Sequence, residues 1–243
     1  MTRPVPPPGP SATASHAPLR LPALYPIVNV VGNDAAAGER ALALGVELAA
    51  AGATLLQLRA KSWGAGALTD LTSRMLEKLR GSAAFLIVND RADVAAACGA
   101  HGVHVGDEDL PVSAVRMVLE RGASIETIVG YSTHSVAEVA AVSAASGAPS
   151  AIPDYLGFGP VFESPTKAGV REARGLDLLR QACRATSLPV VAIGGVTLAT
   201  AVACYRAGAS SVAAISEVER SRDLPALIAT YRAAAREAGI NYS

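Results

Sequence analysis

The sequence predicts a single (β/α)8 TIM barrel with a disordered N-terminal tail. From residue 23 onwards, short apolar runs alternate with longer alanine-rich segments of helical period, which is the pattern of a parallel sheet covered by helices. The length of 243 residues suits one barrel of about 250 residues. Polar residues recur just after the predicted strands, at the end of a barrel where the βα loops build catalytic sites. These observations together predict an enzyme.

The strands are expected where the apolar runs are short and continuous, at 24–31, 54–59, 84–89, 102–105, 127–132, 155–159, 189–193 and 211–215. A helix is expected after each, at 36–51, 66–80, 91–98, 112–121, 135–146, 175–186, 197–207 and 223–238. Aromatic residues make up only 4% of the chain and hydrophobic residues 51%, so the core must be aliphatic, as buried parallel strands are. A doubly wound open sheet is the competing architecture. No Gly-x-Gly-x-x-Gly follows the first strand, which disfavours a dinucleotide fold.

The N-terminal segment, from Met1 to about Leu21, is rich in proline, alanine and serine. Such a composition predicts a disordered tail, with the barrel domain spanning residues 22–243. The segment has no continuous apolar stretch of the kind found in a secretory signal. The sequence contains no uninterrupted run of about 18 apolar residues, so we expect no transmembrane helix.

Charge and cysteine content narrow the class of protein further. The formal net charge is zero, which argues against a nucleic-acid-binding protein and leaves small anionic ligands, bound by a local basic cluster. Cys98, Cys183 and Cys204 show no Cys-x-x-Cys spacing. They are expected to be buried thiols in a reducing, cytoplasmic compartment. The sequence does not fix the oligomeric state, and a homo-oligomer is compatible with it.

Residues 157–167 (Gly-Phe-Gly-Pro-Val-Phe-Glu-Ser-Pro-Thr-Lys) predict an anion site after the sixth strand. Ser164, Thr166, Lys167 and backbone N–H groups can all donate hydrogen bonds to one diphosphate. A lysine on the sixth strand of a barrel could instead form a Schiff base. Because Lys167 lies in a polar loop beyond the strand, we expect it to stay charged.

Gln57, Arg59 and Lys61 alternate with apolar residues along the second strand, so they share one side of it. Two cations and an amide pointing into the mouth of a barrel favour an anion between them. The structural alternative is a set of carboxylate partners across the barrel.

Asn89 and Asp90 end the third strand, and Asp109 follows the fourth. Neighbouring parallel strands bring these groups together, and Mg²⁺ takes one or two carboxylates together with phosphate oxygens and water. The alternative for Asp90 is to cap the helix that begins near Arg91.

Further candidates end the fifth, seventh and eighth strands. Gly194 and Gly195 follow the seventh strand, where glycines let a phosphate approach backbone N–H groups; a plain tight turn is the alternative. Ser132 ends the fifth strand and Ser216 the eighth. The nearby His134 is not assigned a proton-transfer role, and His101 and His104 are expected to be structural.

Taken together, these motifs resemble the thiamine-phosphate synthase family over about residues 23–220. The matching segments are 57–61 (Gln-Leu-Arg-Ala-Lys), 88–93 (Val-Asn-Asp-Arg-Ala-Asp), 102–111, 130–134, 154–162, 166–167 and 192–196. The resemblance implies an enzyme that joins 4-amino-2-methyl-5-hydroxymethylpyrimidine diphosphate to a thiazole phosphate. Thiamine phosphate and pyrophosphate are the products.

The resemblance also implies roles for particular residues. Mg²⁺ would be bound by Asp90 and Asp109, and the catalytic groups would be Arg59, Lys61, Lys167 and Ser132. The diphosphate would be held by Arg59, Lys61, Asn89 and Lys167, with Gln57 and Ser132 near the pyrimidine and pyrophosphate. The thiazole-phosphate side would be lined by Ser164, Thr166, Gly195, Ile215 and Ser216.

Two related functions are alternatives. A thiazole tautomerase of the same superfamily carries histidine where this chain has Pro160 and lacks the full Asn89–Asp90 pair, so the sequence favours the synthase. A non-catalytic regulator that binds thiamine phosphate would not need both Asp90 and Asp109. The chain departs from the usual family residues at four positions, Asn29, Asp107, Glu163 and Ser164, which bear on substrate affinity rather than on the type of reaction.

Overall fold

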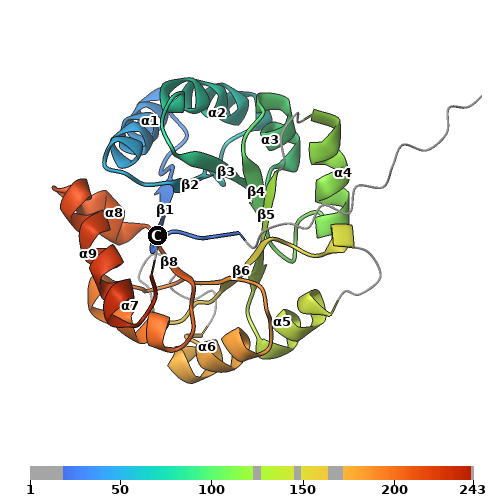
Figure 1. The fold of residues 1–243 in the computed structure, drawn as a ribbon. Helices are drawn as coiled ribbons and strands as arrows, with labels where there is room; N and C mark the ends of the chain where they lie inside the picture. Colours follow the sequence, from blue (N-terminus) through green and yellow to red (C-terminus); the bar gives the residue numbers. More distant parts are fainter. Residues whose placement is uncertain (1–18, 123–126, 145–148, 164–171, 242–243) are drawn as a thin grey trace, which may run out of the picture.

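A computed structural model of the protein describes residues 19–122, 127–144, 149–163 and 172–241. It confirms the predicted barrel: the strands are parallel, pair in chain order and close through β1 and β8 (Figure 1). This closure rules out the doubly wound open sheet. The strands are β1 Leu24–Asn29, β2 Leu55–Arg59, β3 Phe85–Asn89, β4 Gly102–Val105, β5 Ile128–Thr133, β6 Tyr155–Phe158, β7 Val190–Ala192 and β8 Ser211–Ala214.

The helices form a ring around the strands (Figure 1). They are α1 Ala35–Ala50, α2 Ala65–Leu79, α3 Ala92–Cys98, α4 Val112–Gly122, α5 Val136–Ser143, η1 Pro149–Ala151 (a 3₁₀ turn), α6 Gly175–Arg184, α7 Leu198–Arg206, α8 Ser216–Arg220 and α9 Leu224–Glu237. Every predicted strand and helix is present, with small shifts at the ends. Two short elements, η1 and α8, were not predicted, because neither is long enough to show a hydrophobic period.

Two hydrophobic clusters follow from the alternation of side chains along the strands. The larger lies between the strands and the helices and is mainly aliphatic, as the composition predicts. The smaller, called here the inner cluster, lies within the barrel and consists of Leu21, Tyr25, Ile27, Leu55, Ile87, Tyr155, Val191 and Ala213. Its two tyrosines bring hydroxyl groups into an otherwise apolar barrel interior, and these need hydrogen-bond partners there.

Local sequence signals start several helices. Asp34 caps α1 by accepting a hydrogen bond from the Ala37 N–H (2.7 Å). Ser135 caps α5 in the same way through the Glu138 N–H. Asp223 caps α9, which also has proline in its first turn. Each cap satisfies a backbone donor that the helix itself leaves without a partner.

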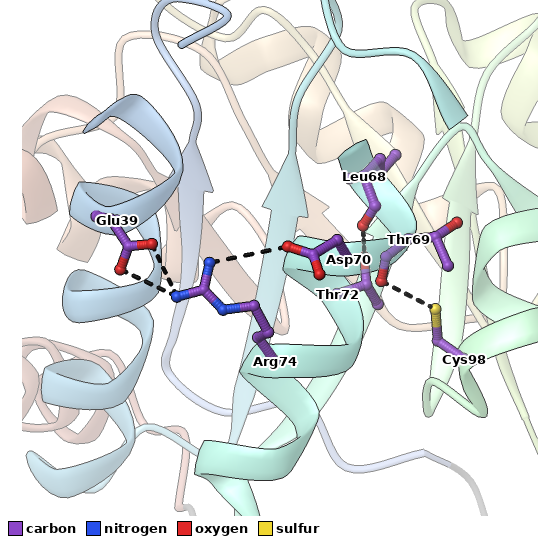
Figure 2. A network of polar contacts seen from close by, with 7 residues as sticks. All are labelled: Glu39, Leu68, Thr69, Asp70, Thr72, Arg74 and Cys98. Carbon is purple, nitrogen blue, oxygen red and sulfur yellow. Dashed lines mark hydrogen bonds and ion pairs between the residues drawn. The ribbon is translucent and has the colours of Figure 1, made fainter. Parts of the chain in front are cut away.

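Polar contacts also join neighbouring helices on the outside of the barrel. Figure 2 shows Arg74 of α2 between Glu39 of α1 and Asp70, with the Nη2 of Arg74 2.8 Å from Oε1 of Glu39. In the same view the Cys98 thiol donates to the Thr69 carbonyl at 3.5 Å. Because the side chains of Arg74, Glu39 and Asp70 are largely exposed, these ion pairs contribute little to stability.

Residues 1–18 of the predicted tail lie outside the described residues. At the predicted end of the tail, Leu21 is buried within the inner cluster and Leu19 packs against that cluster. Among the described residues, none of the helices has both the length and the apolar character that crossing a membrane requires.

Candidate active site

The second strand turns its polar residues into the barrel, as predicted. In the parallel register Gln57 is paired with Ile27 and Arg59 with Asn29. The buried Gln57 side chain donates through Nε2 to the Tyr25 hydroxyl (3.1 Å). Arg59 donates through Nη1 to Oδ1 of Asn29 (2.6 Å). Arg59 therefore sits at the mouth of the barrel, held by a neutral amide.

Lys61 reaches from the end of β2 towards the end of β3. Its Nζ lies 3.6 Å from Oδ2 of Asp90, and the two side chains are 57% and 26% exposed. Burial lowers the pKa of Arg59, and the negative charge of Asp90 opposes that shift. Asp90 is thus a carboxylate partner for both cations. The structural alternative for this basic cluster is therefore met in part.

The backbone at Asp90 is unusual and excludes the predicted alternative role as a helix cap. Asp90 has φ of 65°. Among the described residues, it is the only non-glycine residue with a positive φ. Its N–H donates to the His104 carbonyl (2.8 Å). The N-cap of α3 is Arg91, without a side-chain capping bond. Backbone strain of this kind is often found at functional sites.

Asp90 and Asp109 lie together, as predicted from the order of the strands. Burial raises the pKa of Asp90, the neighbouring Asp109 carboxylate raises it further, and the charge of Lys61 acts in the opposite direction. Asp109 is itself fixed by the Gly106 N–H, which donates to its Oδ2 (2.8 Å). The negative charge of Asp109 thus disfavours ionisation of Asp90, and a bound cation would relieve that repulsion.

The candidate metal ligands at this end of the barrel are two carboxylates, Asp90 and Asp109. No cluster of three or more His, Cys, Asp or Glu side chains suited to a metal occurs within the described part of the chain. Mg²⁺ commonly takes one or two carboxylates and completes its octahedron with phosphate oxygens and water. Asn89 ends β3 beside this pair, in register with His104.

Ser132 belongs to a hydrogen-bonded chain that sequence reasoning did not identify. Its Oγ lies 2.8 Å from Nε2 of His104, and Nδ1 of His104 lies 3.0 Å from the Tyr155 hydroxyl. Tyr155 in turn contacts the Tyr25 hydroxyl (2.9 Å). A small cavity in the barrel is lined by Tyr25, Ile27, Gln57, His104, Tyr155, Gly157, Val191, Ile193 and Ala213. The alternation that singled out Gln57 would also have placed Tyr25 inside the barrel.

The loops after β7 and β8 hold the remaining candidates. Gly195 has φ of 62°, and a Cβ there would lie 2.4 Å from the Glu163 carbonyl oxygen, so the loop after β7 touches the loop after β6. Ile215 is partly buried against the inner cluster and precedes Ser216, the first residue of α8. Ser164, Thr166 and Lys167 lie outside the described residues.

A comparison with known protein families bears on the choice between the synthase and its two alternatives, the tautomerase and the non-catalytic regulator. The family model for thiamine monophosphate synthase matches residues 24–218, which is nearly all of the barrel. The chain belongs to this family.

Relatives and a solved structure agree with the family. The chain is 41% identical over 220 residues to a thiamine-phosphate synthase of Anaeromyxobacter dehalogenans, covering 90% of each chain. It is 40% identical over 210 residues to that of Roseiflexus castenholzii, covering 86% of this chain and 88% of the relative. The thiamine phosphate pyrophosphorylase from Pyrococcus furiosus superposes with a TM-score of 0.71 at 29% identity, covering 90% of this chain and 97% of that one.

Family membership confirms the function predicted from the motifs. The chain is a transferase of thiamine biosynthesis with the activity of the thiamine-phosphate synthases. Asp90, Asp109, Arg59 and Lys61 meet at one end of the barrel in the structure, as the resemblance implied.

Proposed function

We propose that this site joins a pyrimidine carrying a diphosphate to a thiazole phosphate, releasing pyrophosphate, with Mg²⁺ at Asp90 and Asp109. The observation that carries the proposal is the meeting of two carboxylates with Arg59 and Lys61 at one mouth of the barrel. Carboxylates alone would repel a diphosphate, and the cations alone would not need the carboxylates. A diphosphate bound together with Mg²⁺ accounts for both sets of charges.

The chemistry requires charge stabilisation more than proton transfer. The bond between the exocyclic methylene carbon and the diphosphate oxygen breaks, and the oxygen keeps the electron pair. The ring amino group stabilises the resulting pyrimidine cation, and the thiazole nitrogen supplies the lone pair for the new C–N bond. Arg59 and Lys61 stabilise the negative charge that develops on the departing pyrophosphate. Mg²⁺, when bound, neutralises further charge on the same group.

The other residues orient the two substrates. Gln57 lines the small cavity inside the barrel, and Ser132 is hydrogen-bonded to His104, which also lines it. The pyrimidine would lie at the mouth of the barrel beside these two residues. Asn89 ends β3 next to Asp90 and would contact the diphosphate. Backbone N–H groups near Gly195 would hold the thiazole phosphate, with Ile215 and Ser216 beside it. Holding the thiazole nitrogen in line with the methylene carbon accelerates the reaction by making it effectively unimolecular.

The last candidates come from the segment that follows β6 in the sequence and lie outside the described residues. Ser164 and Thr166 would line the thiazole-phosphate side, and Lys167 would hold the diphosphate; these roles remain predictions from the sequence. The charge-clamp role of Lys167 has a specific test. Lys167→Arg should keep part of the turnover, Lys167→Met should lose about a hundred- to a thousandfold, and borohydride should trap no substrate. A trapped adduct, or near-normal turnover in Lys167→Met, would contradict this role.

The proposal includes a cytoplasmic protein whose ligands are small molecules. Cys98, Cys183 and Cys204 are all free, which suits a reducing compartment. The absence of net charge favours small anionic substrates over nucleic acid. A homo-oligomer remains compatible with the sequence.

The test is pyrophosphate release from the two substrates, measured with and without Mg²⁺. We expect release only when both substrates and the metal are present. Asp109→Asn should lower turnover by about a hundredfold or more, because it removes a charge that acts on the reacting centre. Asp93→Asn is the matched control, since Asp93 is an exposed carboxylate paired with Arg91 on α3. Full activity of Asp109→Asn, or of the wild type in excess chelator, would exclude the metal site.

A further inference from the structure

A chain of four hydrogen bonds crosses the barrel interior and ends at Ser132. It runs from Gln57 on β2 to Tyr25 on β1 (3.1 Å), then to Tyr155 on β6 (2.9 Å). It continues to His104 on β4 (3.0 Å) and to Ser132 on β5 (2.8 Å). Five strands therefore contribute one side chain each to a single polar path through the inner cluster.

The orientation of the Gln57 amide sets the direction of this chain. The Gln57 amide donates through Nε2, so the Tyr25 hydroxyl accepts there. Tyr25 is 1% exposed, and its hydroxyl has two hydrogen-bond partners among the described residues, Gln57 and Tyr155. A buried hydroxyl proton needs an acceptor, so the Tyr25 proton must point to the Tyr155 oxygen.

The same reasoning carries the direction on to the histidine. Tyr155 is fully buried and accepts from Tyr25, so its own proton is donated to Nδ1 of His104. Because Nδ1 is an acceptor, the neutral imidazole carries its proton on Nε2. That N–H donates to Oγ of Ser132. The Ser132 hydroxyl proton is then left for an acceptor outside the chain.

Burial keeps the two tyrosines in the required protonation state. It raises the pKa of Tyr25 and of Tyr155 well above that of an ordinary phenol. Both hydroxyls therefore remain donors at neutral pH. Aligned hydrogen bonds in a medium of low dielectric strengthen one another, so the path acts as a unit.

The backbone makes room for the central hydrogen bond of this chain. A Cβ at Gly130 would lie 2.4 Å from both the Tyr155 hydroxyl and Nδ1 of His104. Gly130 is in register with both residues, His104 on one side and Tyr155 on the other. Any side chain at position 130 would displace the two atoms that form the bond.

Ser132 faces the charged end of the barrel. The Cβ position of Gly106 lies 3.6 Å from Oδ2 of Asp109 and 3.9 Å from Cβ of Ser132, so only a glycine separates the serine from the carboxylate. We propose that Tyr155 and His104 are positioning residues that make the Ser132 hydroxyl an obligate hydrogen-bond donor towards the bound diphosphate. This inference rests on the proposed function for the identity of the anion, but the direction of the chain does not depend on it.

The direction is tested by nitrogen NMR of the protein labelled with ¹⁵N-histidine, without any ligand. The chain contains four histidines, and the His104 signals are assigned by their loss in His104→Asn. We expect protonated Nε2 and unprotonated Nδ1. Tyr155→Phe should shift the Nδ1 signal and weaken this preference, whereas Tyr231→Phe should not, because the Tyr231 hydroxyl is buried outside the chain. A proton on Nδ1 in the wild type would overturn the proposal.

The role in anion binding is tested by calorimetric titration with inorganic pyrophosphate and Mg²⁺. Ser132→Ala should weaken binding by about tenfold, the loss of one hydrogen bond to a charged group. Tyr155→Phe should weaken it by about threefold in the wild-type background and have little effect in Ser132→Ala, since it acts through the serine. Additive effects of the two substitutions would overturn the proposal. In one further outcome, the substitutions change pyrophosphate binding as expected while the enzyme releases no pyrophosphate from the two substrates. That result would support the positioning role and contradict the proposed function.

Discussion

Arg59 shows how one residue decides the balance of charge in the site. The guanidinium is half-buried, and burial lowers its pKa, so it needs a fixed acceptor as well as an anion. Asn29 supplies that acceptor through Oδ1 at 2.6 Å without neutralising the charge. Asn29 therefore orients Arg59 and leaves its positive charge for the substrate.

Substituting Asn29 separates orientation from charge. Asn29→Asp keeps an acceptor oxygen in place but partly neutralises the Arg59 charge, so pyrophosphate binding should weaken by only about threefold while thermal stability rises. Asn29→Leu keeps the size but leaves the Arg59 N–H groups without this partner, and binding should weaken by about tenfold. Calorimetric titration with pyrophosphate and Mg²⁺ measures both. Equal binding by Asn29→Leu and Asn29→Asp would show that Arg59 needs no support from β1.

Asp90 links the function of the site to the stability of the fold. Its pKa is raised above the ordinary value of 3.8 in the folded protein, by burial and then by Asp109. Between the ordinary and the raised pKa, the folded state binds more protons than the unfolded state, so stability falls as pH rises through that window. Above the raised pKa the penalty is fully present. The carboxylate pair is thus kept at a cost in stability.

Asp109→Asn should therefore raise the melting temperature at neutral pH while abolishing most activity. If about 1 kcal/mol is recovered, the rise is about 2–4 °C for a protein of this size. The difference should disappear below pH 3.8, where Asp90 is protonated in either state. Mg²⁺ should raise the melting temperature of the wild type more than that of the variant. Differential scanning calorimetry across pH decides this, and an unchanged or lower melting temperature at neutral pH would contradict the account.

At the scale of elements, the strands and helices were predictable and their mutual register was not. Apolar runs such as 102–105 and helical segments such as 66–80 carry their own period in sequence. The pairing of His104 with Gly130, and of Gly130 with Tyr155, depends on how three consecutive strands, each separated from the next by a helical segment, align. Sequence reasoning therefore found Ser132 but treated His104 as structural and missed Tyr25 and Tyr155.

The loop after β7 gives a prediction about how elements fit together. Gly195 has φ of 62°, and a Cβ there would meet the Glu163 carbonyl oxygen at 2.4 Å and the Phe162 Cβ at 2.8 Å. Gly195→Ala should therefore push the loop after β6 away, weaken binding of the thiazole phosphate by about tenfold or more, and lower the melting temperature. Gly64→Ala is the control, because nothing lies within 4 Å of its Cβ position. Steady-state kinetics with each substrate varied separately measure the effect. A uniform rise in both KM values would argue against a local cause.

At the scale of the whole molecule, the closed barrel has two ends with different roles. The site lies at the carboxyl ends of the strands, where loops from many parts of the sequence meet. At the other end, the residues that precede β1 enter the inner cluster, with Leu21 4% exposed and Leu19 packed beside it. The predicted tail, Met1 to about Leu21, thus includes side chains that belong to the core, because two isolated leucines in a proline-rich segment show no period in sequence.

This burial divides the N-terminal segment into two parts that deletion can separate. Removing residues 1–18 should leave both the melting temperature and pyrophosphate affinity nearly unchanged. Removing residues 1–21 should cost about 2–5 kcal/mol, the range for deleting a buried leucine side chain from a core, and lower the melting temperature by about 2–4 °C per kcal/mol. Leu21→Ala in the full chain should reproduce most of that loss. Pyrophosphate affinity, measured well below the transition, should be the same in all variants, because the leucines lie at the end of the barrel opposite the site. A stable protein lacking residues 1–21 would show that the inner cluster does not need them, and a loss of affinity would show that the two ends of the barrel are coupled.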